Sequence, residues 1–163
     1  MLRRGILLCA GLLLLPNLPV NYLEIREGEL LRFAAPLSAG TPFYTSIIHS
    51  VQLTPVVDDY RVVAGKLWTW EERVQSHNAG LPFDAPAHGS FVVDPPWMIV
   101  RGGRYVHEAL AYRVGTEALG RNVWHLPPFP QIDAYAVLPS RRVVFSAGVR
   151  RLSDAPVVGF EAD

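Results

Sequence analysis

Short apolar runs separated by glycine and proline are the feature of this chain that most restricts its fold. From Tyr22 onward these runs are rich in Val, Ile, Tyr, Phe and Trp and alternate with polar residues, which is typical of half-buried strands. The predicted strands are 22–25, 30–34, 43–50, 57–63, 66–72, 90–94, 98–101, 104–114, 123–126, 134–138 and 142–147. Only residues 116–121 indicate a helical turn. Without helices long enough for parallel crossovers, the fold is predicted to be all-β, an antiparallel β-sandwich or a partly closed barrel.

Two hairpins are predicted from turns that contain glycine, because tight hairpin turns require positive φ angles. Ala64 and Gly65 would join strand 57–63 to strand 66–72. Gly102 and Gly103 would likewise join residues 97–101 to residues 104–107. The first hairpin brings two acidic pairs together near its open end, namely Asp58 and Asp59 with Glu71 and Glu72.

The N-terminus has the pattern of a membrane-targeting segment. Arg3 and Arg4 precede Gly5–Leu15, an apolar run of 11 residues, which as a helix would cover about 16 Å, roughly half of a hydrocarbon layer. We therefore expect residues 1–21 to be a signal peptide or an uncleaved signal anchor helix, and residues 22–163 to form a single β domain. Both alternatives place the β domain outside the cytoplasm, in the periplasm or on the extracytoplasmic side of the inner membrane.

Charge and cysteine content exclude several classes of function. The 15 basic and 15 acidic residues balance, whereas a nucleic-acid binder needs a basic face. The single cysteine, Cys9, excludes an intramolecular disulfide and a Cys-based zinc site. The chain has no nucleophile elbow, zinc-protease motif, P-loop or dinucleotide-binding glycine pattern, so neither a cofactor nor an enzymatic activity is predicted.

Titratable and turn-forming residues concentrate between positions 43 and 82. If strands 43–50 and 57–63 are neighbours, one end of the β domain carries a histidine beside acidic groups, over Trp68 or Trp70. We predict a binding or interaction site there rather than a catalytic one. Its candidate residues are His49, Ser50, Thr54, Asp58, Asp59, Asn78 and Gly80.

Two alternatives stay open for these residues. His49, Asp58, Asp59, Glu71 and His77 are suitable metal ligands by type, although their spacing matches no compact ligand signature. An envelope hydrolase would use His49, Ser50 and Asp58 as base, nucleophile and orienting acid. Adjacent residues of a strand point to opposite faces, so His49 and Ser50 could cooperate only if the strand ended between them.

The same segment resembles a known family. Ile48-His49-Ser50-Val51, then Thr54-Pro55-Val56, an acid before Tyr60, and Ala79-Gly80-Leu81-Pro82 are similar to small domains catalogued as domain of unknown function DUF1850. The resemblance implies an extracytoplasmic accessory domain of a TAXI-type TRAP solute transporter. Its expected partners are the transporter's membrane subunits or its solute-binding protein. His49 would be the hydrogen-bonding centre, Asp58 and Asp59 its acidic partners, and Gly80 a position of close backbone approach.

Overall fold

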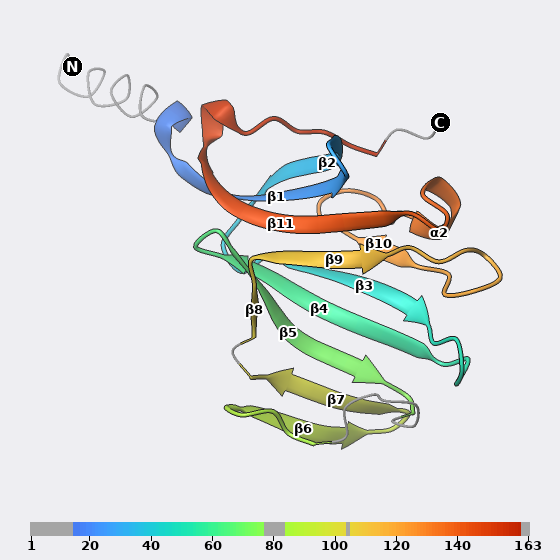
Figure 1. Cartoon of the computed structure of the whole chain (residues 1–163). Coiled ribbons are helices and arrows are strands. Elements are labelled where there is room, and N and C mark those ends of the chain that lie inside the picture. The colour runs from blue at the N-terminus through green and yellow to red at the C-terminus, as the bar shows by residue number, and fades with distance from the viewer. Residues whose placement is uncertain (1–14, 77–83, 104, 161–163) are drawn as a thin grey trace, which may run out of the picture.

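A computed structural model describes residues 15–76, 84–103 and 105–160, which form two antiparallel β-sheets in a sandwich-like arrangement (Figure 1). The prediction of an all-β antiparallel fold is therefore confirmed. The predicted N-terminal signal or anchor helix (residues 1–21) lies outside the described residues up to position 14. Its last part differs from the prediction, because residues 15–17 form a 3-10 helix and Pro19 already begins a strand of the β domain. Within the described ranges, no helix has both the length and the apolar character that crossing a membrane requires.

The smaller sheet has four strands in the order β2-β1-β11-β9. Its strands are β1 (Pro19–Glu27), β2 (Leu30–Leu37), β9 (Ala109–Arg113) and β11 (Arg142–Arg151). Two short 3-10 helices, η1 (Leu15–Asn17) and η2 (Leu152–Asp154), flank β1 and β11. Because β1 pairs with β11 along almost its whole length, this sheet joins the two ends of the described chain.

The larger sheet has the order β10-β3-β4-β5-β7-β6, with β8 also paired to β5. Its strands are β3 (Pro42–Ile48), β4 (Pro55–Val63), β5 (Lys66–Val74), β6 (Gly89–Asp94), β7 (Trp97–Gly102), β8 (Val106–His107) and β10 (Val123–His125). Figure 1 shows that β7 and β6 extend away from the smaller sheet. Side chains of β6 are correspondingly exposed or half-buried.

The core lies between the two sheets. Its largest fully buried side chains include Trp124, Phe43, Phe145 and Phe33, which come from both sheets. Phe145 of β11 packs against Trp124 with ring centroids 5.2 Å apart in an edge-to-face geometry. This apolar layer holds the inner face of β3, β4 and β5 against the smaller sheet.

The predicted hairpin at Ala64 and Gly65 is confirmed, because β4 and β5 pair directly across it. Both residues have positive φ angles, 51° and 71°. The Gly65 N–H donates to Asn21 Oδ1 at 2.9 Å, which ties the turn to β1. A Cβ atom on Gly65 would lie 2.9 Å from the carbonyl carbon of Gly148 in β11. The hairpin tip thus fits closely against the smaller sheet.

The predicted hairpin at Gly102 and Gly103 is wrong. Both glycines have positive φ angles, 75° and 91°, but the chain leaving β7 does not fold back on it. Instead β8 pairs with Leu67 and Trp68 of β5, so β7 and β8 follow one another along the same edge of β5. The true partner of β7 on its other side is β6, joined to it by a tight turn at Pro95 and Pro96.

Three other local predictions also differ from the structure. The predicted strand 104–114 is divided at Glu108, where the chain passes from the larger sheet to the smaller one. The predicted strand 134–138 is in fact the short helix α2 (Ala134–Val137). The prediction failed because the buried residues Ala134 and Leu138 are four positions apart, a spacing that fits a helix as well as a strand. Residues 116–121 form a turn in which the Leu119 N–H bonds to the Thr116 carbonyl at 3.2 Å, without a helix.

Candidate functional site

A β-bulge in β5 determines which acidic side chains face the inside of the sandwich. Tyr60 pairs with Thr69, whereas Asp59 pairs with Glu71, so Trp70 is an extra residue in β5. A regular ladder from the Ala64 turn would place Glu71 on the inner face; the extra residue places Glu72 there instead. Bulges of this kind commonly redirect side chains next to functional sites.

As a result Asp58 and Glu72 lie directly opposite each other in neighbouring strands. They share the inner face with Tyr60, because residues two apart in a strand point the same way. Tyr60 is 5% exposed and belongs to the core cluster. The two carboxylic acids therefore border the apolar core, where unpaired charge is costly.

A break in the neighbouring strand opens a pocket beside these acids. The Thr69 N–H donates to the Tyr105 carbonyl at 3.2 Å, and Glu71 pairs with Arg101 of β7. The continuous pairing along β5 is therefore interrupted at Trp70, between these two points. The resulting cavity has a volume of about 450 Å³, within the usual range for small-molecule sites. We call it the acid pocket; its lining includes Asp58, Tyr60, Thr69, Trp70, Glu72, Val100, Gly102, Gly103, Tyr105 and His107.

Aromatic rings form much of the wall of the acid pocket. The ring of His107 lies edge-on to Tyr105 at 4.6 Å and to Tyr60 at 6.4 Å between centroids. His107 Nε2 lies 2.8 Å from Thr69 Oγ1, a hydrogen bond that fixes the imidazole. Trp70, at the bulge, is 53% exposed and lines the pocket from the solvent side.

Burial changes the titration of the groups in this pocket. It raises the pKa of Asp58 to about 6, an effect that a hydrogen bond from Tyr60 partly offsets. It raises the pKa of Glu72 to about 7, and the charge of Asp58 adds to the increase. Burial lowers the pKa of His107, which keeps the imidazole neutral near pH 7. The two facing carboxyl groups thus take up or release protons near neutral pH.

The opposite face of the same two strands carries a second acidic pair with a different environment. Asp59 and Glu71 also face each other, but three arginines neutralise them. Asp59 lies 3.2 Å from Arg61, and Glu71 lies 2.6 Å from Arg101 and 3.4 Å from Arg73. Asp58 and Asp59, which the sequence grouped together, therefore occupy opposite faces and different environments.

His49 does not join the acids. It follows the end of β3, and its Nδ1 accepts hydrogen bonds from the N–H groups of Val51 and Gln52, both at 3.2 Å. Its own N–H donates to the Thr54 carbonyl at 2.8 Å. The prediction that β3 neighbours β4 is confirmed, but Asp58 pairs with Thr45, well inside the strand. His49 thus organises the loop between β3 and β4.

The remaining predicted site residues lie along that loop or outside the described chain. Ser50 is exposed, and Thr54 Oγ1 is buried without a hydrogen-bond partner. Since β3 ends at Ile48, both His49 and Ser50 lie beyond the strand. Asn78 and Gly80, like the candidate metal ligand His77, fall outside the described residues.

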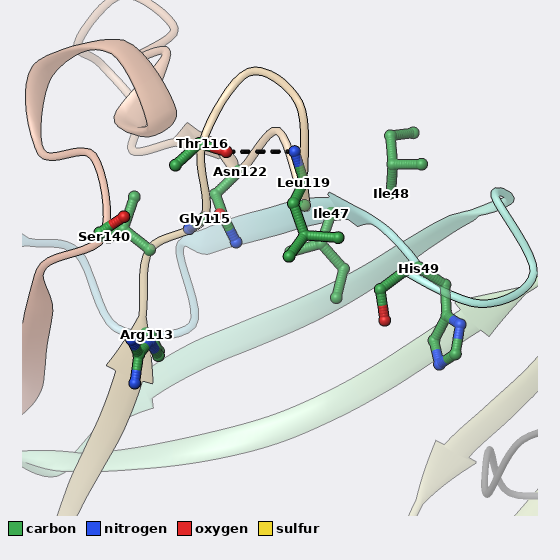
Figure 2. A pocket seen from close by; sticks show the side chains of 12 residues that line it. Ile47, Ile48, His49, Arg113, Gly115, Thr116, Leu119, Asn122 and Ser140 are labelled. Carbon is green, nitrogen blue, oxygen red and sulfur yellow. Dashed lines mark hydrogen bonds between the residues drawn. The ribbon is translucent and has the colours of Figure 1, made fainter.

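His49 and Ser50 line a separate pocket of about 410 Å³ at the end of the sandwich (Figure 2). Figure 2 shows Ile47 and Leu119 inside this hollow, with the His49 ring at its edge and directed away from Asn122. Asp58 lines the acid pocket instead. The hydrolase arrangement of His49, Ser50 and Asp58 is therefore not assembled, and the described residues contain no group of three or more metal-ligating side chains.

Sequence reasoning did not identify Tyr60, Thr69, Tyr105 and His107 as site residues. The sequence predicts His107 in a hairpin with β7, whereas the structure pairs it with Leu67 of β5. A sequence signal did exist for Glu72, since the Ala64 turn predicts that it lies near Asp58. The bulge that turns it inward has no sequence marker.

The fold and the site together describe an antiparallel β-sandwich domain with an acid-lined pocket at the break between β7 and β8. The chain belongs to the family described as domain of unknown function (DUF1850), whose model matches residues 43–125, just over half of the 163 residues. The family resemblance found in the sequence is thereby confirmed. The chain matches no curated protein and no solved structure. All the acid-pocket residues named above lie within the matched segment.

Proposed function

We propose that this chain is a non-enzymatic binding domain on the extracytoplasmic side of the membrane, and that it binds a small ligand in the acid pocket. The observation that carries this proposal is the pair of facing acids, Asp58 and Glu72, at an open cavity of about 450 Å³. Apolar walls with a few convergent polar groups are typical of ligand sites. Groups whose pKa is shifted toward neutrality in a cleft also favour a functional site.

The proposal includes an accessory role for a TAXI-type TRAP solute transporter, which rests on the family resemblance. The N-terminal apolar run supports a location outside the cytoplasm, either as a released domain or as one anchored by residues 1–21. The contact with the transporter is assigned to the loop between β3 and β4, which includes His49, Ser50 and Thr54. Two apolar side chains of this loop, Val51 and Leu53, are 69% and 75% exposed, and exposed apolar groups that lie close together favour a protein contact.

Thermal unfolding in the presence of a panel of small solutes tests the binding half of this proposal. At least one solute should raise the melting temperature of the wild-type protein and not that of Glu72→Gln, because a ligand that binds only the folded state stabilises it. Glu71→Gln is the matched control, since Glu71 is the neighbouring acid on the outer face. Turnover of ester or peptide substrates that disappears in Ser50→Ala would contradict a non-enzymatic role.

Co-purification of this chain with the co-expressed membrane subunits of a TAXI-type transporter tests the accessory role. The double substitution Val51→Ser with Leu53→Ser should reduce co-purification without changing the melting temperature, because both side chains are exposed. Equal recovery of the transporter with the double variant would contradict the assignment of this loop.

A further inference from the structure

The two acidic pairs of β4 and β5 provide an internal comparison. Like charges directly opposite each other destabilise a sheet. On the outer face, Arg61, Arg73 and Arg101 neutralise Asp59 and Glu71. On the inner face, no basic side chain among the described residues lies within ion-pair distance of Asp58 or Glu72. The inner pair thus lacks the countercharge that the same strands supply one residue away.

The inner pair is also the more desolvated pair, which increases the need for a countercharge. Asp58 neighbours the core residue Tyr60 on one strand and the buried Thr45 on the next, and Thr45 is 1% exposed. A proton shared by the acids can neutralise part of this charge, and a cationic ligand can neutralise it while filling the adjacent cavity.

The walls of the acid pocket suit an organic cation. Trp70, Tyr60 and Tyr105 line the cavity, and the faces of such rings attract ammonium groups. Burial lowers the pKa of His107, and the hydrogen bond between its ring and Thr69 fixes the position of the imidazole. The described lining residues include no Lys or Arg. The Arg61 guanidinium lies over one face of the Trp70 ring, 5.7 Å from its centroid, so a bound cation would use the other face.

We propose that the acid pocket binds a small organic monocation, with Asp58 and Glu72 as the countercharge and the rings of Trp70, Tyr60 and Tyr105 as the surrounding wall. This inference rests on the proposed function and specifies the class of its ligand. A bare divalent metal fits less well, because calcium needs six to eight oxygen ligands and no group of three or more ligating residues occurs in the described chain. A carboxylate ligand would add a third negative charge to the pair.

Three isosteric probes separate charge from shape. Choline, 3,3-dimethylbutan-1-ol and 3,3-dimethylbutanoate present nearly the same branched group in cationic, neutral and anionic form. Each is titrated calorimetrically into the full chain at about pH 8, where both acids are ionised, with calcium, magnesium and zinc chlorides as separate arms. Choline should bind at least about tenfold more tightly than the alcohol, since each partly desolvated cation interaction contributes on the order of 1–2 kcal/mol.

Variants link this binding to the pocket. Asp58→Asn and Glu72→Gln should each weaken choline binding at least about tenfold, and Trp70→Ala should weaken it several-fold. Glu71→Gln should change it by no more than about twofold, because Glu71 lies on the outer face with its arginines. Trp70 is 53% exposed, so loss of binding in Trp70→Ala with an unchanged melting temperature excludes misfolding as the cause.

The outcomes distinguish this inference from the proposed function. If the alcohol or the carboxylate binds the wild type as tightly as choline, and Trp70→Ala weakens that binding, the pocket is a ligand site and the cationic class is wrong. If a metal chloride alone binds and Glu72→Gln abolishes it, the organic class is likewise wrong. If neither these probes nor the solute panel bind, the proposed function fails together with the inference.

Discussion

Asp58 and Glu72 face each other across β4 and β5 on the inner side of the larger sheet, and no described arginine lies within ion-pair distance of either acid. One residue away, Asp59 and Glu71 form the equivalent pair on the outer side with arginines. The same two strands thus carry one acidic pair with arginine partners and one pair for which the described residues provide none.

The stability of the protein should depend on pH through the inner pair. Because the pKa values of Asp58 and Glu72 are raised to about 6 and about 7, the folded state binds protons that the unfolded state has released. The resulting stabilisation is present below about pH 4 and is lost as the pH rises through 6 to 7. The free energy of unfolding of the wild type, relative to the double variant Asp58→Asn with Glu72→Gln, should fall by on the order of 3 kcal/mol between about pH 4.5 and pH 8.

Urea unfolding of both proteins at several pH values measures this difference. The other titratable groups around the pocket, Tyr60, Tyr105 and His107, are present in both proteins, so their contributions largely cancel. If the difference in free energy of unfolding between the two proteins stayed constant or rose with pH, Asp58 and Glu72 would not be buried without a countercharge.

Deletion of Trp70 should be tolerated. Without this residue the pairs Tyr60 with Thr69, Asp59 with Glu71 and Asp58 with Glu72 form an uninterrupted ladder, so every side chain keeps its face. We expect a loss of less than about 2 kcal/mol of stability, with the circular dichroism spectrum of a β protein retained. Deletion of Arg61 from β4 is the control: it leaves β5 with two more residues than β4 over the same stretch of the ladder, and it should prevent cooperative unfolding. If the two deletions behaved alike, the bulge would not lie at Trp70.

Gly65→Ala should be more destabilising than Gly28→Ala. Both glycines have positive φ angles, 71° and 56°, so alanine at either position costs about 1–2 kcal/mol of backbone strain. At Gly65 the new methyl group would also lie 2.9 Å from both Gly148 and Val149, whereas at Gly28 nothing lies within 4 Å. Thermal unfolding should therefore give a loss at Gly65 that exceeds the loss at Gly28 by at least about 1 kcal/mol, and equal losses would mean that the hairpin tip does not touch β11.

His49→Ala should affect the loop between β3 and β4 rather than the acid pocket. It removes an acceptor for two backbone N–H groups, and the expected loss is about 1 kcal/mol of stability. Co-purification with the transporter should fall because the loop loses its shape, while ligand affinity at the acid pocket should stay unchanged. Ser50→Ala, at an exposed position, is the control and should alter the free energy of unfolding by less than about 0.5 kcal/mol. If His49→Ala lowered the ligand affinity of the acid pocket, His49 would have to be counted among the residues of that site.

The sequence predicted the parts of this structure that depend on local rules. Alternation of apolar and polar residues identified most strands, and the glycine turn at Gly65 identified the pairing of β4 with β5. The errors arose where the outcome depends on distant partners. Gly102 and Gly103 have the positive φ angles that their sequence suggests. These angles do not determine the next pairing: the chain continues along β5, where β8 pairs with Leu67 and Trp68, and does not fold back on β7.

The candidate site shows the same division. Alternation along β4 correctly separates Asp58 from Asp59, although their adjacency in the sequence suggested a joint role. The inward position of Glu72 depends on one extra residue in β5, and the contribution of His107 depends on the break between β7 and β8. The bulge has no composition of its own, and the two glycines at the break are equally compatible with a hairpin, so the pocket could not be derived from the sequence.

Carbon-13 NMR titration of the Asp58 and Glu72 carboxyl groups, with and without saturating choline, tests the central claim most directly. Without choline the two groups should titrate near pH 6 and pH 7, and with choline both midpoints should move to lower pH, because a bound cation favours the ionised carboxyls. Midpoints near pH 4 in the free protein, or midpoints that choline leaves unchanged, would contradict it.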